Sequence, residues 1–181
     1  MKVWHEIIGG FLQNQGTLTG MIKLWADIHA KCCKPGHTNA NFSPWNSNWK
    51  HRAEHISRFS AEEPIILVYA YSWGAGWGAR QLAKELDKRG LEIRMMILSD
   101  PVYRHPYWLG NWRAFWPYSV IKFPPNVNEI SYYIQRIDWP RGHKVEGNKV
   151  HNPVEVSRGH RWMDEAPEFL RECLFAAETL G

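Results

Sequence analysis

Cysteine is scarce in this sequence, and the few cysteines present form no recognisable framework. Cys32, Cys33 and Cys173 are an odd number and include no Cys-x-x-Cys pair, which favours a reducing compartment over a disulfide-stabilised fold. Cys32, Cys33 and His37 also lack the paired spacing of a zinc site. The sequence therefore predicts neither disulfide bonds nor a bound metal.

Long hydrophobic runs are absent as well. No apolar stretch approaches the roughly 18 to 20 residues that span a bilayer, and the start of the chain is too charged for a signal peptide. We therefore expect a cytoplasmic protein without a transmembrane segment. Lys and Arg are scattered and the net charge is only +4, so the sequence does not indicate nucleic-acid binding.

Repeats, linkers and low-complexity tracts are also missing. A chain of 181 residues with 44% hydrophobic content suits one domain with one core, here residues 1–181. Tryptophan, by contrast, is abundant, with 11 residues. Such aromatic crowding is typical of core packing, and a ligand-binding surface is the alternative.

Strand-like and helix-like patterns alternate along the chain. Strands are predicted at residues 3–8, 39–44, 65–70, 91–98 and 129–137. Helices are predicted at residues 21–31, 48–59, 76–89 and 165–180. The segments 102–128 and 138–152 are expected to be irregular. This alternation predicts a three-layer α/β/α fold with a mainly parallel sheet of about five strands, and a functional site at the carboxyl ends of the strands.

A serine lies where the strand 65–70 runs directly into a helix. The sequence Ala70-Tyr71-Ser72-Trp73-Gly74 has the small-x-Ser-x-Gly form of a nucleophile elbow, a sharp turn that lifts the serine hydroxyl above the sheet. Small residues flank the serine because bulkier side chains would collide with the neighbouring backbone. Ser72 is therefore the candidate nucleophile.

A carboxylate and a histidine that could activate this serine follow in order along the chain. Asp100 ends the strand after the elbow helix, and His160 precedes the closing helix on a loop that could place its ring over the sheet edge. The carboxylate would orient the imidazole, which would take the serine proton. His143 and His151 are the alternative bases, and Ser-Asp-Pro is also a common turn sequence.

These motifs together resemble the α/β-hydrolase family of serine hydrolases, in its compact lipase or esterase form. The resemblance spans most of the chain and implies that Ser72 is the nucleophile, Asp100 the acid and His160 the base. It also implies an oxyanion hole made by the backbone N–H of Trp73 and the segment containing Gly10 and Phe11. The implied substrate is a small-molecule carboxylic ester, and no cofactor is needed. Ala70 departs from the usual first glycine of the motif.

The aromatic segment after Asp100, residues 102–125, suggests which acyl group the substrate carries. It leaves the sheet directly after the predicted acid, so we expect Trp108 and Trp112 to form one wall of a pocket for an apolar acyl group.

Two other functions fit parts of the sequence. Gly74-x-Gly76-x-x-Ala79 after a strand, with Asp100 further on, also matches a dinucleotide-binding fingerprint. Alternatively, the protein is a non-catalytic binding module of hydrolase fold that uses an aromatic surface. The members of that surface would be Tyr107, Trp108, Trp112, Phe115, Trp116 and Tyr118.

Overall fold

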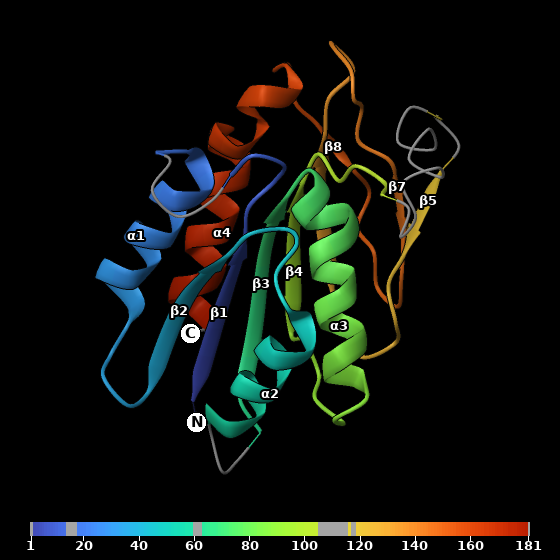
Figure 1. Ribbon diagram of the computed structural model, residues 1–181. Helices are drawn as coiled ribbons and strands as arrows, with labels where there is room; N and C mark the ends of the chain where they lie inside the picture. The colour runs from blue at the N-terminus through green and yellow to red at the C-terminus, as the bar shows by residue number, and fades with distance from the viewer. Residues whose placement is uncertain (1, 14–17, 60–62, 105–115, 117–118, 181) are drawn as a thin grey trace.

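A computed structural model describes residues 2–13, 18–59, 63–104, 116 and 119–180 of the chain. In this described part, six strands form one sheet in the order β2-β1-β3-β4-β6-β8, and every neighbouring pair is parallel. The strands are β1 Val3–Ile8, β2 Thr38–Ser43, β3 Ile65–Tyr71, β4 Met95–Ser99, β6 Ile130–Ile134 and β8 Val154–Glu155. Two further short strands, β5 Val120–Lys122 and β7 Lys144–Glu146, pair beside it (Figure 1).

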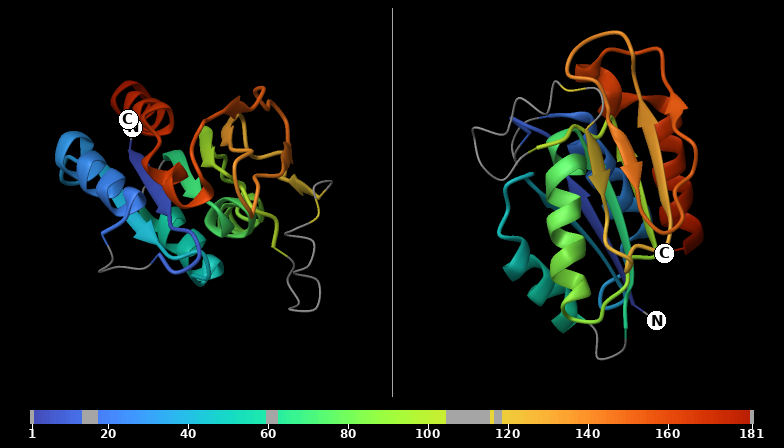
Figure 2. Two further views of the ribbon diagram at one scale, coloured as in Figure 1. Left: turned by 90° about the horizontal axis from the view of Figure 1, so that it is seen from above. Right: turned by 90° about the vertical axis from the view of Figure 1, so that its right-hand side faces the viewer.

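Helices cover both faces of the sheet, which gives three layers (Figure 2, left). Helices α1 Gly20–Cys32 and α4 Pro167–Leu180 pack on one face, and α2 Trp49–Phe59 and α3 Ala79–Asp87 on the other. Each face has its own hydrophobic core. A π-helix, η1 Gly74–Gly78, precedes α3, and a 3-10 helix, η3 His160–Glu165, precedes α4.

Local chemistry explains where the long helices begin. The Thr19 hydroxyl accepts a hydrogen bond from the backbone N–H of Ile22, and the Asn48 side chain accepts one from His51. Such N-caps satisfy backbone donors that have no partner inside the helix. Pro167 starts α4, a position where its missing N–H costs nothing. The predicted α/β fold with a mainly parallel sheet is confirmed.

The sheet has six strands where about five were predicted. The additional strand is β8, whose two residues are both exposed and whose pattern is too short to be recognised from periodicity. β7 likewise lies within a segment predicted to be a loop. The strand predicted at 91–98 begins only at Met95, after Ile93 has made an isolated bridge to Val127.

The strand order of the sheet reverses between β1 and β3, which makes this a topological switch point. From β1 the chain reaches β2 on one side, whereas β3 and the later strands lie on the other. Ligands bind at such a switch point, outside the carboxyl ends of the strands. These ends meet at the upper edge of the sheet in Figure 1. Among the described residues, no helix has the length and apolar character needed to cross a membrane.

A buried histidine in β1 makes the stability of the fold depend on pH. His5 is fully buried beside the Tyr69 hydroxyl, 3.1 Å from its Nδ1. Burial lowers the pKa of His5 from 6.5 to about 4. Between these values the unfolded chain binds a proton that the folded chain does not. Stability is therefore retained above pH 6.5 and falls as the pH drops toward 4.

We expect His5→Gln to flatten this dependence. The unfolding free energy of the parent protein should lose about 3 kcal/mol more than that of the variant between pH 6.5 and 4, at about 1.4 kcal/mol per pH unit. Urea unfolding at several pH values measures both slopes. His51→Gln, at an exposed position of α2, is the control and should behave as the parent does. Equal slopes in the parent and His5→Gln would contradict the prediction.

Candidate active site

Ser72, Asp100 and His160 meet at the carboxyl edge of the sheet. Ser72 follows β3 and Asp100 follows β4, and these strands are neighbours with Tyr71 opposite Ser99. His160 begins η3, after β8. The Ser72 Oγ lies 2.9 Å from the His160 Nε2, and the His160 Nδ1 lies 2.6 Å from the Asp100 Oδ2.

These contacts define which atoms carry protons. A carboxylate can only accept hydrogen bonds, so the His160 Nδ1 donates to Asp100. In the neutral ring Nε2 then has a free lone pair, and it accepts from the Ser72 hydroxyl. Asp100 is fully buried, and Ser72 and His160 are 4% and 9% exposed. The hydroxyl is therefore placed to lose its proton to the imidazole in an environment that water enters little.

The turn at Ser72 has the strained backbone of a nucleophile elbow. Ser72 has φ 54°, in the left-handed region that costs an L-residue about 1–2 kcal/mol. Its carbonyl accepts from the backbone N–H groups of Gly76 and Val102, at 2.9 and 3.1 Å. A Cβ on Gly76 would lie 1.8 Å from the Val102 carbonyl oxygen, and one on Gly74 would lie 2.4 Å from that of Gly9. Both glycines are needed for close approach of the backbone.

Gln135 holds the Asp100 carboxylate in place. Its backbone N–H donates to the Asp100 Oδ1 at 3.2 Å, and its side-chain Nε2 donates to Oδ2 at 3.1 Å. The same side chain accepts from the backbone N–H groups of Ile137 and Asp138. Gln135 is itself fully buried, so it fixes both Asp100 and the loop that follows β6.

That loop in turn holds His160. The Asp138 carboxylate accepts from the His160 backbone N–H at 2.6 Å, and the Tyr71 hydroxyl donates to the His160 carbonyl at 2.7 Å. The Tyr71 and His160 rings stack with centroids 5.3 Å apart. Burial raises the pKa of Tyr71, so its phenol stays a neutral donor. The imidazole is thus oriented through its ring and its backbone.

Part of the segment predicted to form an oxyanion hole lies next to Ser72, but the Gly10 N–H already has an acceptor. A Cβ on Gly10 would lie 3.0 Å from that of Ser72, but the Gly10 N–H donates to the Gln13 Oε1. Gln13 also donates to Asp164, a buried carboxyl whose pKa is raised by burial. In the described part of the chain, the backbone N–H groups of Phe11 and Trp73 have no acceptor.

The two alternative bases lie elsewhere. The His143 Nδ1 accepts from the Tyr103 backbone N–H, and its Nε2 lies 3.1 Å from the Trp116 carbonyl oxygen. His151 pairs with Glu129 at 2.5 Å. His143 therefore anchors the segment after Asp100, and His151 belongs to a surface ion pair.

The proposed acyl-pocket residues Trp108 and Trp112 lie outside the described residues, as do Tyr107, Phe115 and Tyr118 of the aromatic surface. Trp116 is described and is 52% exposed.

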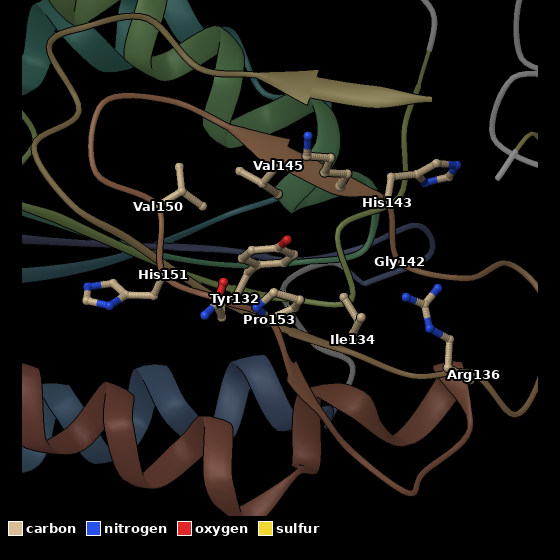
Figure 3. A pocket seen from close by; sticks show the side chains of 11 residues that line it. Tyr132, Ile134, Arg136, Gly142, His143, Val145, Val150, His151 and Pro153 are labelled. Atoms are coloured by element: carbon tan, nitrogen blue, oxygen red, sulfur yellow. The ribbon is translucent and has the colours of Figure 1, made fainter. Parts of the chain in front are cut away.

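A cavity lies beside Asp100 rather than at Ser72. It has a volume of about 540 Å³ and is lined by residues of β6, β7 and the segment before β8, with Tyr132, Val145 and Val150 around its centre (Figure 3). Gly142 lines it, and a Cβ there would lie 2.4 Å from the Asp100 Oδ1. The cavity has no Ser72 or His160 in its lining, so it does not hold the reacting atoms.

Several residues of this site were not predicted from the sequence. Gln135 and Asp138 hold Asp100 and His160, and Gln13 accepts from the Gly10 N–H beside Ser72. Gln135 falls inside the strand predicted at 129–137, whereas β6 ends at Ile134 and so places Gln135 at the edge where parallel strands position functional groups. Asp138 and Gln13 lie in loops with no comparable pattern.

No cluster of three or more His, Cys, Asp or Glu side chains suited to a metal occurs within the described ranges. All three cysteines are free thiols. Comparison with models of known protein families and with curated proteins gives no match for this chain.

Proposed function

We propose that the protein is a serine hydrolase that cleaves small carboxylic esters, of the α/β-hydrolase type. The observation that carries this proposal is the continuous hydrogen-bond chain from Ser72 Oγ through the His160 ring to Asp100, with distances of 2.9 and 2.6 Å. A serine, a histidine and a carboxylate in this order are the groups that acyl transfer requires. The strained φ of Ser72 adds support, since strain of this kind clusters at active sites.

The chemistry would proceed in two steps. The His160 Nε2 takes the Ser72 proton as Oγ attacks the ester carbonyl, and the resulting imidazolium is stabilised by Asp100. The backbone N–H groups of Trp73 and Phe11 are assigned to the oxyanion. His160 then gives its proton to the departing alcohol, leaving an acyl group on Ser72. Water, deprotonated by His160, releases the acid and restores the serine.

The contacts of the glycines and of Asp100 favour this function over dinucleotide binding. Gly74 and Gly76 lie against backbone atoms of Gly9 and Val102. Asp100, the candidate ribose-binding acid, is fully buried and bonded to His160 and Gln135. A ribose-binding carboxylate must instead reach the ligand.

Labelling with a fluorophosphonate probe tests the proposal. Only an activated serine reacts quickly with such a probe, and this also separates an enzyme from a non-catalytic module of the same fold. We expect rapid labelling of the parent protein, with the adduct on the peptide containing Ser72. Ser72→Ala should not be labelled.

Ser57→Ala is the matched control. Ser57 is a half-buried serine of α2 whose hydroxyl donates to the Glu54 carbonyl, so its loss should leave labelling unchanged. An unlabelled parent protein, or an adduct mapped to another residue, would refute the proposed function.

A further inference from the structure

An arginine is enclosed by aromatic side chains next to Ser72. The Arg104 guanidinium lies over the ring of Trp45 at 4.2 Å and also over those of Trp73 and Trp77, at 5.2 and 5.5 Å. The Phe11 ring extends this surface and lies 4.5 Å from Trp73. We call these five residues the Arg104 cluster. No step of the mechanism described above uses its arginine.

The Arg104 cluster is continuous with the candidate active site. Trp73 directly follows Ser72, and both Trp73 and Phe11 carry the backbone N–H groups assigned to the oxyanion. Val102, two residues before Arg104, donates its N–H to the Ser72 carbonyl. Phe11 is 52% exposed and the other four side chains are half-buried. A substrate on Ser72 can therefore reach this surface.

The charge of Arg104 is not neutralised by any described side chain. Its Nε is buried without a hydrogen-bond partner among the described residues. The following residues 105–118 contain no Asp or Glu in their sequence. Burial lowers the pKa of Arg104, as expected for a cation that is desolvated without an anion beside it.

The cation–π contacts leave the N–H groups of Arg104 available to bind an anion. The guanidinium carbon lies over the indole rings, which offer the guanidinium N–H groups no carboxylate or carbonyl acceptor. A carboxylate matches the planar guanidinium with two parallel hydrogen bonds. The surrounding aromatic rings reduce contact with water and so strengthen the interaction.

We propose that the Arg104 cluster binds a carboxylate carried by an apolar or aromatic part of the ester substrate. This inference rests on the proposed function and gives it a substrate class, esters with a second, ionised carboxyl group. The aromatic rings contact the hydrocarbon, and Arg104 binds the charge.

Matched ester pairs test the proposal. One pair places the charge on the acyl side, as mono-p-nitrophenyl glutarate against its methyl ester. The other places it on the leaving group, as 4-acetoxybenzoate against methyl 4-acetoxybenzoate. In the parent protein, kcat/KM should favour the anionic member of at least one pair, and Arg104→Gln should reduce that preference by about tenfold or more. The affected pair identifies the side that carries the carboxylate.

Two variants serve as controls. Arg104→Lys keeps the charge but loses the planar fork, so it should restore part of the preference. Arg58→Gln removes one charge from an exposed position of α2, where Arg58 pairs with Glu54, and should leave the preference unchanged. An equal preference in the parent and Arg104→Gln for both pairs would overturn the inference while leaving the proposed function intact.

A binding measurement keeps the two proposals separate. Ser72→Ala cannot turn the ester over, so calorimetric titration with mono-p-nitrophenyl glutarate or 4-acetoxybenzoate reports binding alone. Adding Arg104→Gln should weaken the Kd of the preferred ester by about tenfold. The parent protein could prove to be neither labelled nor active while ester binding still depends on Arg104. That result would refute the proposed hydrolase function and support the anion site. If Arg104→Gln leaves the Kd of both esters unchanged, the anion site is refuted.

Discussion

Ser72→Ala is expected to lower kcat for p-nitrophenyl acetate by roughly five orders of magnitude or more. The variant loses the attacking oxygen, and His160 then has no proton to remove from a nucleophile. Residual hydrolysis would come only from the oxyanion donors and from binding. Initial-rate kinetics on purified parent and variant measure the effect. Hydrolysis by Ser72→Ala at the parent rate would show that another group attacks the ester.

The stability of two variants separates this loss from unfolding. Alanine keeps the strained backbone, whereas glycine adopts φ 54° without the penalty of a Cβ. Ser72→Gly should therefore be about 1 kcal/mol more stable than Ser72→Ala in urea unfolding. Both variants should be inactive. An inactive variant that is at least as stable as the parent would show that the strain serves the nucleophile rather than the fold.

The local part of this site could be predicted from the sequence. The elbow at Ser72 is a short-range pattern, because an apolar strand, a small-residue turn and a helix follow one another within about a dozen residues. The close contacts at Gly74 and Gly76 explain why small residues are required there. Parallel strands also bring their carboxyl ends to one edge, so Asp100 was predictable from its place after β4. The parallel α/β fold followed from the same alternation.

What could not be predicted depends on contacts between distant segments. β8 has two exposed residues, and it becomes a strand because Tyr133 and Ile134 offer it a partner. The Arg104 cluster draws its side chains from the turns after β1, β2 and β3, from η1 and from the segment after β4. No sequence periodicity relates these positions. Which histidine faces Ser72 was likewise open from the sequence. His143 and His151 lie close to His160 in sequence, but they bind Tyr103 and Glu129 instead.

Asp100→Asn is expected to lower kcat by about 10⁴-fold. The amide removes the negative charge that would stabilise the imidazolium of His160. The amide also brings an NH₂ group to a site surrounded by hydrogen-bond donors. Gln135 already donates its backbone N–H and its Nε2 to the two carboxylate oxygens. If the amide nitrogen faces His160, the ring proton moves to Nε2, which can then no longer accept the Ser72 proton. If it faces the Gln135 backbone, two N–H groups oppose each other and the charge is still lost.

Two measurements distinguish this effect from a general disturbance of the fold. The Nδ1 proton of His160, which donates to Asp100 over 2.6 Å, should give a downfield proton NMR signal that disappears in His160→Ala and that disappears or moves upfield in Asp100→Asn. The double variant Ser72→Ala with Asp100→Asn should be no slower than Ser72→Ala alone, since residues that act as a unit are not additive. Additive losses would instead mean that Asp100 contributes independently of Ser72. In that case the carboxylate would support the fold of the sheet edge rather than the base that activates the serine.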